Sequence, residues 1–165
     1  MKPLHVNNLE IRLAQTESEV AASQSLRYQV FFKEMGAKTP PRVALSELDF
    51  DPYDEFCDHL LVIDRDRSTA RYPKVLGTYR LLRGQVADEY AGFYSESEFD
   101  LNALIARSPQ VLELGRSCID AEYRSRGTMQ LLWRGIAEYV FKHSIKYLFG
   151  CASFPGADPA DMRLP

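Results

Sequence analysis

Apolar and polar residues alternate over 9–15, as in a half-buried strand, and further apolar runs bounded by charged or turn residues predict the other strands of a sheet. Strands are expected at 9–15, 59–65, 74–83, 111–119 and 146–154. A charged loop separates the second strand from the third, which predicts an antiparallel hairpin. The last two strands flank a helical segment, and a strand–helix–strand unit of this kind should cross over right-handed.

The longest helical pattern follows the first strand. Thr16 and Glu19 have the spacing of a capping box, which predicts a helix over 17–35 that ends before Gly36. Arg27 falls on the apolar stripe of this helix, which also carries Met35 at its end. An arginine in such a place either extends to the rim of the core or enters a binding site.

Two further helices are expected at 95–106 and 128–143, and the second of them is strongly amphipathic. The stretch 37–58 carries three prolines and an acidic cluster. It is expected to be a long loop with a functional role, because structureless loops of this length are otherwise uncommon.

The 165 residues suffice for one domain with a sizeable core, since 45% are hydrophobic and 26% charged, as in ordinary soluble proteins. No apolar run approaches the roughly 20 residues of a membrane-spanning helix, and the N-terminus lacks the apolar core of a signal peptide, so a cytoplasmic location is expected.

The net charge of −3 argues against a generic nucleic-acid binder. Widely spaced cysteines and histidines predict no disulfide framework and no metal site, and we expect buried, reduced thiols at Cys57, Cys118 and Cys151.

The fourth strand passes into the last helix through Arg124-x-x-Gly127, a spacing that predicts an anion cradle. A glycine lets the backbone approach a ligand, and the start of a helix presents unpaired N–H groups and the positive end of its dipole. Arg124 and Arg126 add positive charge, and Thr128 opens the helix. The alternative is a solvated helix start without a ligand.

This turn resembles the pyrophosphate-binding turn of the GCN5-related (GNAT) acyltransferase superfamily, except that Met129 stands where the superfamily has a small residue. From Leu9 onward the chain resembles the ornithine N-acyltransferases of bacterial ornithine-lipid synthesis, a hemolysin-like family that uses acyl carrier protein. It is more distantly similar to the acyl-homoserine-lactone synthases. The segments that carry the resemblance, in order, are RYQVFF at 27–32, FDPYDEFCDHLLV at 50–62, LGTYRLL at 76–82, GFYSESEFDL at 92–101, ELGRSCI at 113–119 and GCASFPG at 150–156.

The resemblance implies an α+β fold of the GNAT type, with a mixed central sheet flanked by helices and a single domain over 1–165 that lacks the C-terminal strands of longer members. It also implies an acyltransferase that moves a 3-hydroxyacyl group from acyl carrier protein to the α-amino group of ornithine, forming lyso-ornithine lipid. No cofactor is expected beyond the donor, a thioester of acyl carrier protein or coenzyme A. A lipid product suggests peripheral contact with the inner membrane surface.

Two alternatives stay open. An acyl-homoserine-lactone synthase would use S-adenosylmethionine as the amine donor. A non-catalytic module would bind acyl carrier protein without forming an amide.

By the same resemblance, the segment 113–117 forms the reaction centre. Glu113 is the candidate base, with Arg116 beside it, and the backbone from Gly115 to Ser117 is the candidate hydrogen-bond donor to the thioester carbonyl. In a regular strand Glu113 and Arg116 face opposite sides, so a bulge near Gly115 is implied if both line one pocket. The alternative role of Glu113 is a structural ion pair with an arginine.

Ornithine carries an α-carboxylate and two amines. Its carboxylate suits a bidentate arginine, for which the candidates are Arg27, Arg80 and Arg116. Its distal ammonium suits Asp51 and Asp54, although these residues can instead order their own loop.

Other side chains permit two interpretations. Phe31, Phe93 and Tyr94 either line the acyl passage or belong to the core. Cys57 and His59 share a strand face, but a thiol catalyst needs an oriented base and a third group, which nothing nearby in the sequence supplies. Five basic residues gather around the last helix, either as a patch that attracts an acidic carrier protein or as a solvated face: Arg124, Arg126, Arg134, Lys142 and Lys146.

Overall fold

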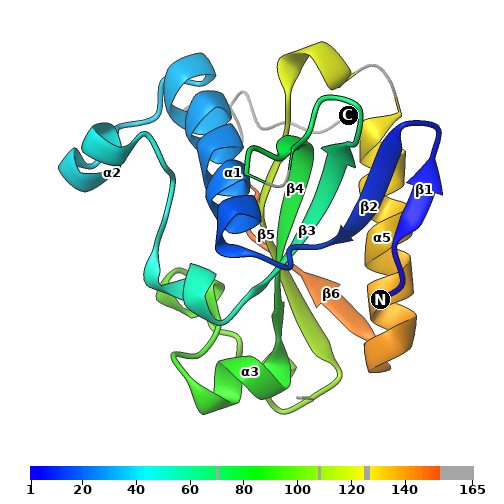
Figure 1. The fold of residues 1–165 in the computed structure, drawn as a ribbon. Helices are drawn as coiled ribbons and strands as arrows, with labels where there is room; N and C mark the ends of the chain where they lie inside the picture. Colours follow the sequence, from blue (N-terminus) through cyan, green and yellow to red (C-terminus); the bar gives the residue numbers. More distant parts are fainter. Residues whose placement is uncertain (70, 108, 125–126, 153–165) are drawn as a thin grey trace, which may run out of the picture.

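The computed structural model describes residues 1–69, 71–107, 109–124 and 127–152. At its centre lies a six-stranded sheet in the order β1-β2-β3-β4-β5-β6 (Figure 1). Neighbouring strands are antiparallel except for the parallel pair β5 and β6, which confirms the predicted hairpin and mixed sheet. The strands are β1 Leu4–Val6, β2 Leu9–Leu13, β3 Asp58–Asp64, β4 Lys74–Arg83, β5 Val111–Ile119 and β6 Tyr147–Phe149.

The two outer strands differ from the prediction. β1 is only three residues long, too short for an alternating pattern to be recognised, and it turns into β2 through Asn7 at φ 54, a left-handed conformation that asparagine tolerates. β6 ends at Phe149, whereas the expected strand covered 146–154. The end of that expected strand, at 153 and 154, lies outside the described residues.

The first helix begins where predicted. α1 (Glu17–Tyr28) is capped by Thr16, whose hydroxyl accepts the Glu19 N–H at 3.3 Å. The carboxylate of Glu19 pairs with an arginine of β2 and also accepts the Gln15 N–H at 2.7 Å. The helix continues as a π-helical segment, η1 (Gln29–Glu34). Its wider turn shifts the following residues around the axis, so Met35 is 64% exposed and does not lie on the buried stripe.

Two stretches between the main elements also differ from the prediction. The expected loop at 37–58 contains two short helices. The expected helix at 95–106 is interrupted, because Asp100 accepts the Asn102 N–H at 3.0 Å and starts a new turn. A further helix, which the pattern did not predict, follows β4. The short helices are α2 Pro41–Ser46, η2 Pro52–Glu55, α3 Gly84–Glu89, η3 Tyr94–Ser97, α4 Asn102–Ile105 and η4 Ala121–Tyr123.

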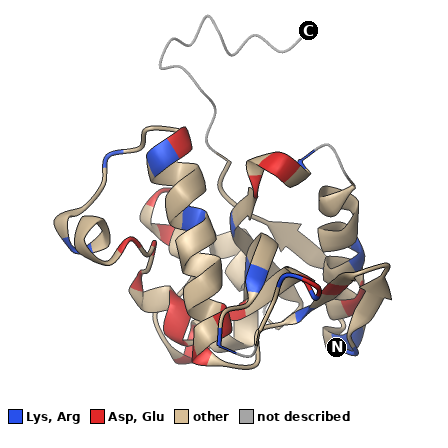
Figure 2. Ribbon diagram, turned by 45° about the horizontal axis from the view of Figure 1, so that its top comes forward, with Lys and Arg blue, Asp and Glu red and all other residues tan. Residues whose placement is uncertain are grey.

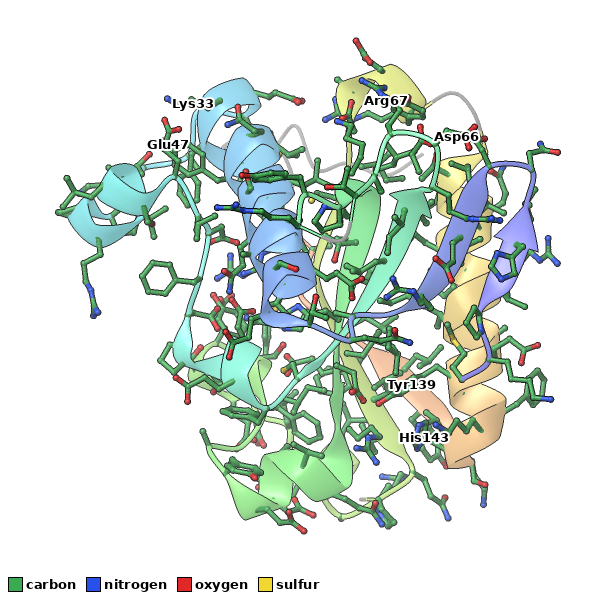
Figure 3. The ribbon with its side chains drawn as sticks, in the orientation of Figure 1. Lys33, Glu47, Asp66, Arg67, Tyr139 and His143 are labelled. Carbon is green, nitrogen blue, oxygen red and sulfur yellow. The ribbon has the colours of Figure 1, made fainter. Side chains whose placement is uncertain are left out.

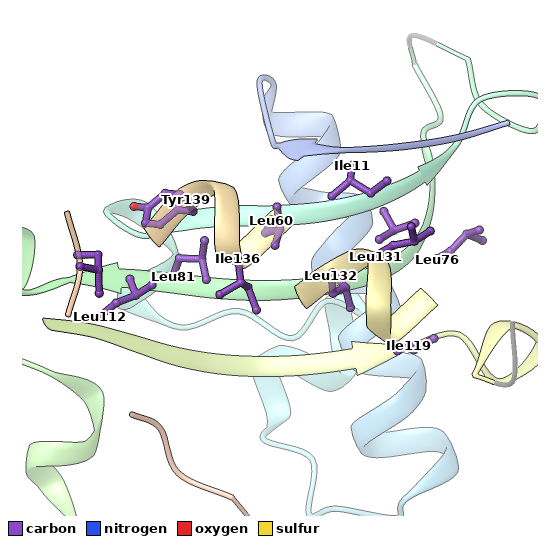
Figure 4. Close-up of a cluster of buried hydrophobic side chains, with 12 residues drawn as sticks. Ile11, Leu60, Leu76, Leu81, Leu112, Ile119, Leu131, Leu132, Ile136 and Tyr139 are labelled. Atoms are coloured by element: carbon purple, nitrogen blue, oxygen red, sulfur yellow. The ribbon is translucent and has the colours of Figure 1, made fainter. Parts of the chain in front are cut away.

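The long helices α1 and α5 (Thr128–His143) lie on opposite faces of the sheet, and α5 has the predicted bounds (Figure 1). Alternate residues of β3 separate the two cores: Leu60 and Val62 pack against α5, whereas Leu61 and Ile63 pack against α1. Figure 4 shows the core between α5 and the sheet. Among the residues described, no helix combines the length and the apolarity that crossing a bilayer requires.

Candidate active site

A β-bulge in β5 lies at the predicted reaction centre. Thr78 of β4 pairs with Cys118, and Arg80 pairs with Gly115, so β5 has two residues where β4 has one. One of these two is Arg116, which has φ +52. The backbone therefore leaves regular strand geometry directly after Gly115.

The bulge exchanges the two faces of the strand. Leu112 packs in the α5 core, whereas Cys118, six residues later, packs on the α1 side. Residues six apart in a regular strand face the same side. The bulge therefore brings Glu113 and Arg116 to the face opposite α5, and this confirms the bulge that the sequence implied if both line one pocket.

Six charged side chains form a network on this face. Arg27 of α1 is its most buried arginine, with 1% of its side chain exposed. Its Nε donates to Asp49 Oδ2 at 2.9 Å, and its two terminal nitrogens donate to both carboxylate oxygens of Asp54 at 3.0 and 2.6 Å. In this structure Arg27 thus binds two carboxylates of the protein itself. The network consists of Arg27, Asp49, Asp51, Asp54, Arg80 and Arg116.

The network opens toward solvent at one end. Arg80, with 5% of its side chain exposed, donates through Nη1 to Asp51 at 2.6 Å and to Asp54 at 3.1 Å. Arg116 donates through Nη2 to the other oxygen of Asp51 at 3.0 Å. The side chains of Arg116 and Asp51 are 27% and 17% exposed. Of the predicted substrate-binding residues in the network, these two are the most accessible.

Electrostatics keep the carboxylates ionised at neutral pH. Burial acts to raise the pKa of Asp54, but the hydrogen bonds and charge of Arg27, together with Arg80, outweigh burial and hold that pKa at about 2. Burial acts in the same direction on Asp51, whose pKa is lowered overall by Arg80 and Arg116. Burial alone would lower the pKa of Arg80, yet Asp51 and Asp54 raise it. With three arginines against three aspartates, the ionised network has no net charge.

Asp51 and Asp54 also hold their own segment in place. Asp51 accepts the Tyr53 N–H at 2.9 Å, and Asp54 accepts the Asp51 N–H at 3.3 Å, which caps η2 reciprocally. Gln24 of α1 donates to Asp54 Oδ2 at 3.0 Å. The loop-ordering role left open by the sequence is therefore present in the structure. Contact with a substrate ammonium stays a prediction.

Glu113 is buried, with 4% of the residue exposed. Its carboxylate accepts the backbone N–H groups of Tyr94 at 2.8 Å and Ser95 at 2.9 Å, and it also accepts the Ser95 hydroxyl. No arginine among the described residues forms an ion pair with Glu113. Sequence reasoning missed Ser95 because a contact 18 residues away leaves no local signal.

Tyr94 joins Glu113 to the charge network. The guanidinium groups of Arg80 and Arg116 lie 5.6 and 5.5 Å from the centre of its ring. The other two aromatic candidates occupy core positions: Phe93 is 2% exposed and Phe31 packs on the α1-side core. A role of either phenylalanine in the acyl passage stays a prediction.

The predicted anion cradle contains a glycine in the left-handed conformation. Gly127, the N-cap residue of α5, has φ +77 and no side chain with which to cap the helix. The hydroxyl of Thr128 donates to the Tyr123 carbonyl at 3.0 Å. Arg124 donates to the Ile119 carbonyl at 3.1 Å and pairs with Glu34 at 2.5 Å. Arg126 lies outside the described residues.

The basic residues predicted around α5 are spread along the length of the helix. Lys142 lies in the last turn of α5, and about 1.5 Å per residue separates it from Gly127 by roughly 22 Å. Figure 2 shows basic and acidic segments interspersed over the ribbon. Lys146 lines a cavity of about 450 Å³ together with Arg83 and His143. His143 lies at the C-terminal end of α5 (Figure 3).

The cysteines occupy different environments. Burial raises the pKa of Cys57 and of Cys118 to about 12, so both thiols are protonated at neutral pH. His59 directs Nε2 to the Asp54 carbonyl at 3.1 Å, and its Nδ1 has no hydrogen-bond partner among the described residues, so His59 and Cys57 are not hydrogen-bonded there. Cys151 is exposed, so the expectation of three buried thiols is wrong at this position.

The chain is similar to known proteins along most of its length. The family described as Acetyltransferase (GNAT) domain matches residues 26–134. A protein of Agrobacterium fabrum named L-ornithine N(alpha)-acyltransferase is 47% identical over 156 residues, which cover 93% of this chain and 53% of that protein. Proteins of the same name from Rhizobium meliloti and Rhodobacter capsulatus are 45% and 42% identical, over 96% and 94% of this chain. The chain spans 54% and 60% of the length of these two relatives.

Solved structures share the fold. The acyl-homoserine-lactone synthase LasI matches with a TM-score of 0.59 and 19% identity, over 86% of this chain and 71% of that chain. FeeM, an N-acyl amino acid synthase from uncultured soil microbes, matches with a TM-score of 0.57 and 14% identity, over 89% and 70%. Similarity at this level of identity shows the fold alone, and it agrees with the α+β architecture expected from the sequence.

Proposed function

Because the chain belongs to the GNAT acetyltransferase family, we propose that it catalyses transfer of a 3-hydroxyacyl group from acyl carrier protein to the α-amino group of ornithine, with lyso-ornithine lipid as the product. The observation that carries this proposal is the 42% to 47% identity to proteins named L-ornithine N(alpha)-acyltransferase, over at least 93% of the chain. The geometry of the site supports an amino acid as the acceptor.

The accessible pair of Arg116 and Asp51 is the best candidate for the acceptor site. Arg27 and Arg80 are buried against protein carboxylates, and breaking such pairs to bind a substrate carboxylate would cost several kcal/mol. Arg116 and Asp51 lie at the solvent end of the same network and offer one charge of each sign. An amino acid with a carboxylate and ammonium groups complements both.

The thioester carbonyl fits beside the second half of β5. Amide formation needs a polarised carbonyl held in fixed geometry against a neutral amine. β6 pairs with β5 only from Val111 to Glu113, and no described residue of β4 pairs with Arg116 or Ser117 at the bulge. The backbone N–H groups of Arg116 and Ser117 can therefore serve as donors to a ligand, whereas Gly115, the other expected donor, pairs with Arg80 of β4.

The donor is expected to bind at the start of α5. The N–H groups of the first turn of α5, after Gly127, suit a phosphate. Met129 is 38% exposed and takes the place where a small residue lets the pyrophosphate of free coenzyme A approach. Acyl carrier protein, which carries a single phosphate on its arm, should therefore be the better donor.

We further propose that the protein works at the membrane surface, because its proposed product is a lipid. A lyso-lipid partitions into bilayers, so release is easiest where the enzyme touches one. Co-sedimentation with vesicles of bacterial lipids tests this contact.

The deciding experiment is incubation of the protein with 3-hydroxyacyl carrier protein and a panel of amino acids, followed by mass spectrometry of the extracted lipid. An acylated ornithine is expected, with slower product formation from the coenzyme A thioester at equal concentration. Consumption of S-adenosylmethionine would instead identify an acyl-homoserine-lactone synthase. Carrier binding without amide formation from any amine would identify a binding module.

A further inference from the structure

The cavity of about 450 Å³ beside the end of α5 lies outside the proposed acyltransferase site. Three other segments contribute to its lining: Arg83 ends β4, Gln85 belongs to α3, and Gln110 directly precedes β5. The volume falls within the range of small-molecule sites, roughly 300 to 1,000 Å³. At about 1.5 Å per residue, His143 lies roughly 24 Å along α5 from Gly127, so the cavity is separate from the expected donor site.

The backbone after α5 brings charged and polar side chains to this cavity. Ser144 has φ +54, a left-handed conformation that ends the helix. Ile145 then packs into the core with 7% of the residue exposed. The N–H groups of Lys146 and Tyr147 both donate to the Gln110 carbonyl, at 2.8 and 3.0 Å. These bonds hold the start of β6 against the residue before β5, so Lys146 and Gln110 line the same cavity.

Positive charge exceeds negative charge around the cavity. Arg83 has one carboxylate partner among the described residues, Asp58, and the distance of 3.8 Å exceeds that of a hydrogen bond. Asp58 also accepts the Tyr139 hydroxyl at 2.5 Å. Lys146 forms no ion pair with any residue that the structure describes. Two cations of the lining therefore share a single, distant carboxylate.

His143 lies within this excess of positive charge (Figure 3). Burial lowers the pKa of its ring, and the positive charges of Arg83, Lys142 and the Met1 amino group lower it further. Asp58 acts in the opposite direction but does not outweigh them. An anion in the cavity would offset this repulsion and raise the pKa of His143.

The lining suits an anion that has several acceptor oxygens. An arginine can donate to two phosphate oxygens at once, and a lysine binds phosphate as a point charge, which are the roles open to Arg83 and Lys146. Gln85, Gln110 and Ser144 line the same cavity and can add neutral hydrogen-bond donors. The negative end of the α5 dipole opposes an anion, but it is equivalent to about half a unit charge, less than the two cations supply.

We propose that this cavity is a second anion site, which binds a phosphate ester carried either by a soluble molecule or by the head group of a phospholipid. A cavity of this size admits a small anion, whereas it does not fit the folded surface of an acidic protein. The proposal goes beyond the acyltransferase function and does not depend on it, because no residue of the charge network lines the cavity.

The first test is an NMR titration of the histidine ring signals with sn-glycerol 3-phosphate at constant ionic strength. We expect a saturable shift and a raised pKa at His143, and no shift at His59, which is buried in the other site. Lys146→Glu should weaken binding roughly tenfold or more, because it replaces a cation with an anion. Lys38→Glu makes the same change of charge at an exposed lysine outside the cavity and should leave the affinity unchanged.

Co-sedimentation with vesicles distinguishes the two sources of the phosphate. If the ester belongs to a lipid, vesicles of phosphatidylglycerol and phosphatidylcholine should bind the wild type and Lys38→Glu but not Lys146→Glu, and pure phosphatidylcholine should bind none of them. Binding of glycerol phosphate without binding of vesicles identifies a soluble ester.

Three results would overturn the inference. Neither probe binds; or both lysine variants lose binding equally, which indicates a general effect of charge; or Lys146→Glu loses binding of acyl carrier protein while it keeps that of glycerol phosphate, which assigns this end of α5 to a protein partner. None of these measurements requires amide formation, so a failure of the proposed function leaves the test intact.

Discussion

The hydrogen bonds of Glu113 determine what a substitution there can do. Two backbone donors and one hydroxyl point at its two oxygens, so only a group that accepts on both sides fits without loss. A carboxylate does so. An amide does not, because one of its two ends is itself a donor.

Glu113→Gln is therefore expected to lower both stability and turnover. The amide nitrogen would face at least one N–H group, and a buried donor left unsatisfied costs about 1 to 3 kcal/mol of unfolding free energy. Loss of the proton acceptor should reduce turnover about a hundredfold or more, measured per folded molecule. The control is Glu98→Gln, an exposed position in the same segment, which should change neither quantity. A destabilised variant with normal turnover per folded molecule would rule out proton acceptance by Glu113.

His59 makes stability depend on pH. Burial lowers the pKa of His59, assisted by the charges of Arg27 and Arg80, while Asp54 acts to raise it. Nδ1 is buried without a hydrogen-bond partner among the described residues. The unfolded chain, with its pKa near 6.5, therefore binds a proton more readily than the folded protein.

The contribution of His59 to the free energy of unfolding should thus be complete above about pH 6.5 and be lost as the pH drops below that value. Urea titrations between pH 7.5 and 5 measure this slope. His59→Gln should reduce it, leaving the part due to His143, whose pKa burial also lowers, whereas the same change at the exposed His5 should leave it unchanged. An equal slope in the wild type and in His59→Gln would assign the loss to other groups.

At the scale of elements, an ion pair joins η1 to the residue that follows η4. Arg124 pairs with Glu34, and the two side chains are 50% and 37% exposed. An exposed pair of this kind is worth about 0.2 to 1 kcal/mol, so Arg124 can exchange Glu34 for an acidic partner at little cost. Glu34 would therefore compete with the proposed carrier protein for Arg124.

Glu34→Gln should strengthen binding of acyl carrier protein by about two- to fivefold at low salt, because it releases Arg124. Arg124→Gln should weaken binding and reduce its salt dependence. Glu47→Gln provides a control, since Glu47 pairs with Lys33 at 3.6 Å near the end of η1 (Figure 3). Equal affinity of all three variants at low salt would show that Arg124 faces solvent and not a carrier.

The sequence correctly predicted those helices and strands that show a clear pattern over consecutive residues. α5 has the expected bounds because its amphipathic period runs unbroken from Thr128 to His143. The expected helix at 95–106 failed where Asp100 starts a new turn, and the π-helical segment η1 carries no recognisable period of its own. The sequence implied a bulge in β5 only on the condition that Glu113 and Arg116 line one pocket.

The residues of the site were easier to predict from the sequence than the contacts that these residues make with one another. Resemblance to a family named Arg27 and Asp54 as site residues, but their pairing joins positions 27 residues apart and depends on the complete fold. Ser95 and Cys151, 56 residues apart, meet only because η3 and the end of β6 converge on Glu113. Asp49 belonged to a recognised acidic cluster, yet nothing in its neighbours distinguished it from Glu47.

At the scale of the molecule, the charge network joins α1, the segment before β3, β4 and β5 into one unit. A buried charge left without its partner is strongly destabilising, by about 3 to 5 kcal/mol. Arg27 holds Asp49 and Asp54 at the buried end, and Arg116 adds a second arginine to Asp51 at the open end. Substitutions at the buried end of the network should therefore lower stability, whereas substitutions at the open end should weaken substrate binding.

Arg27→Gln is expected to lower the free energy of unfolding by about 3 to 5 kcal/mol, since Asp49 and Asp54 would remain buried without this arginine. Arg116→Gln should cost at most about 1 kcal/mol, because its side chain is 27% exposed and Asp51 keeps Arg80 as a partner. The same Arg116 variant should raise KM for ornithine tenfold or more, as about 1.4 kcal/mol of lost binding requires. Urea denaturation and steady-state kinetics on both variants test the separation. Normal KM in Arg116→Gln would place the acceptor elsewhere, and a stable Arg27→Gln would show that loop 49–55 does not depend on the buried end of the network.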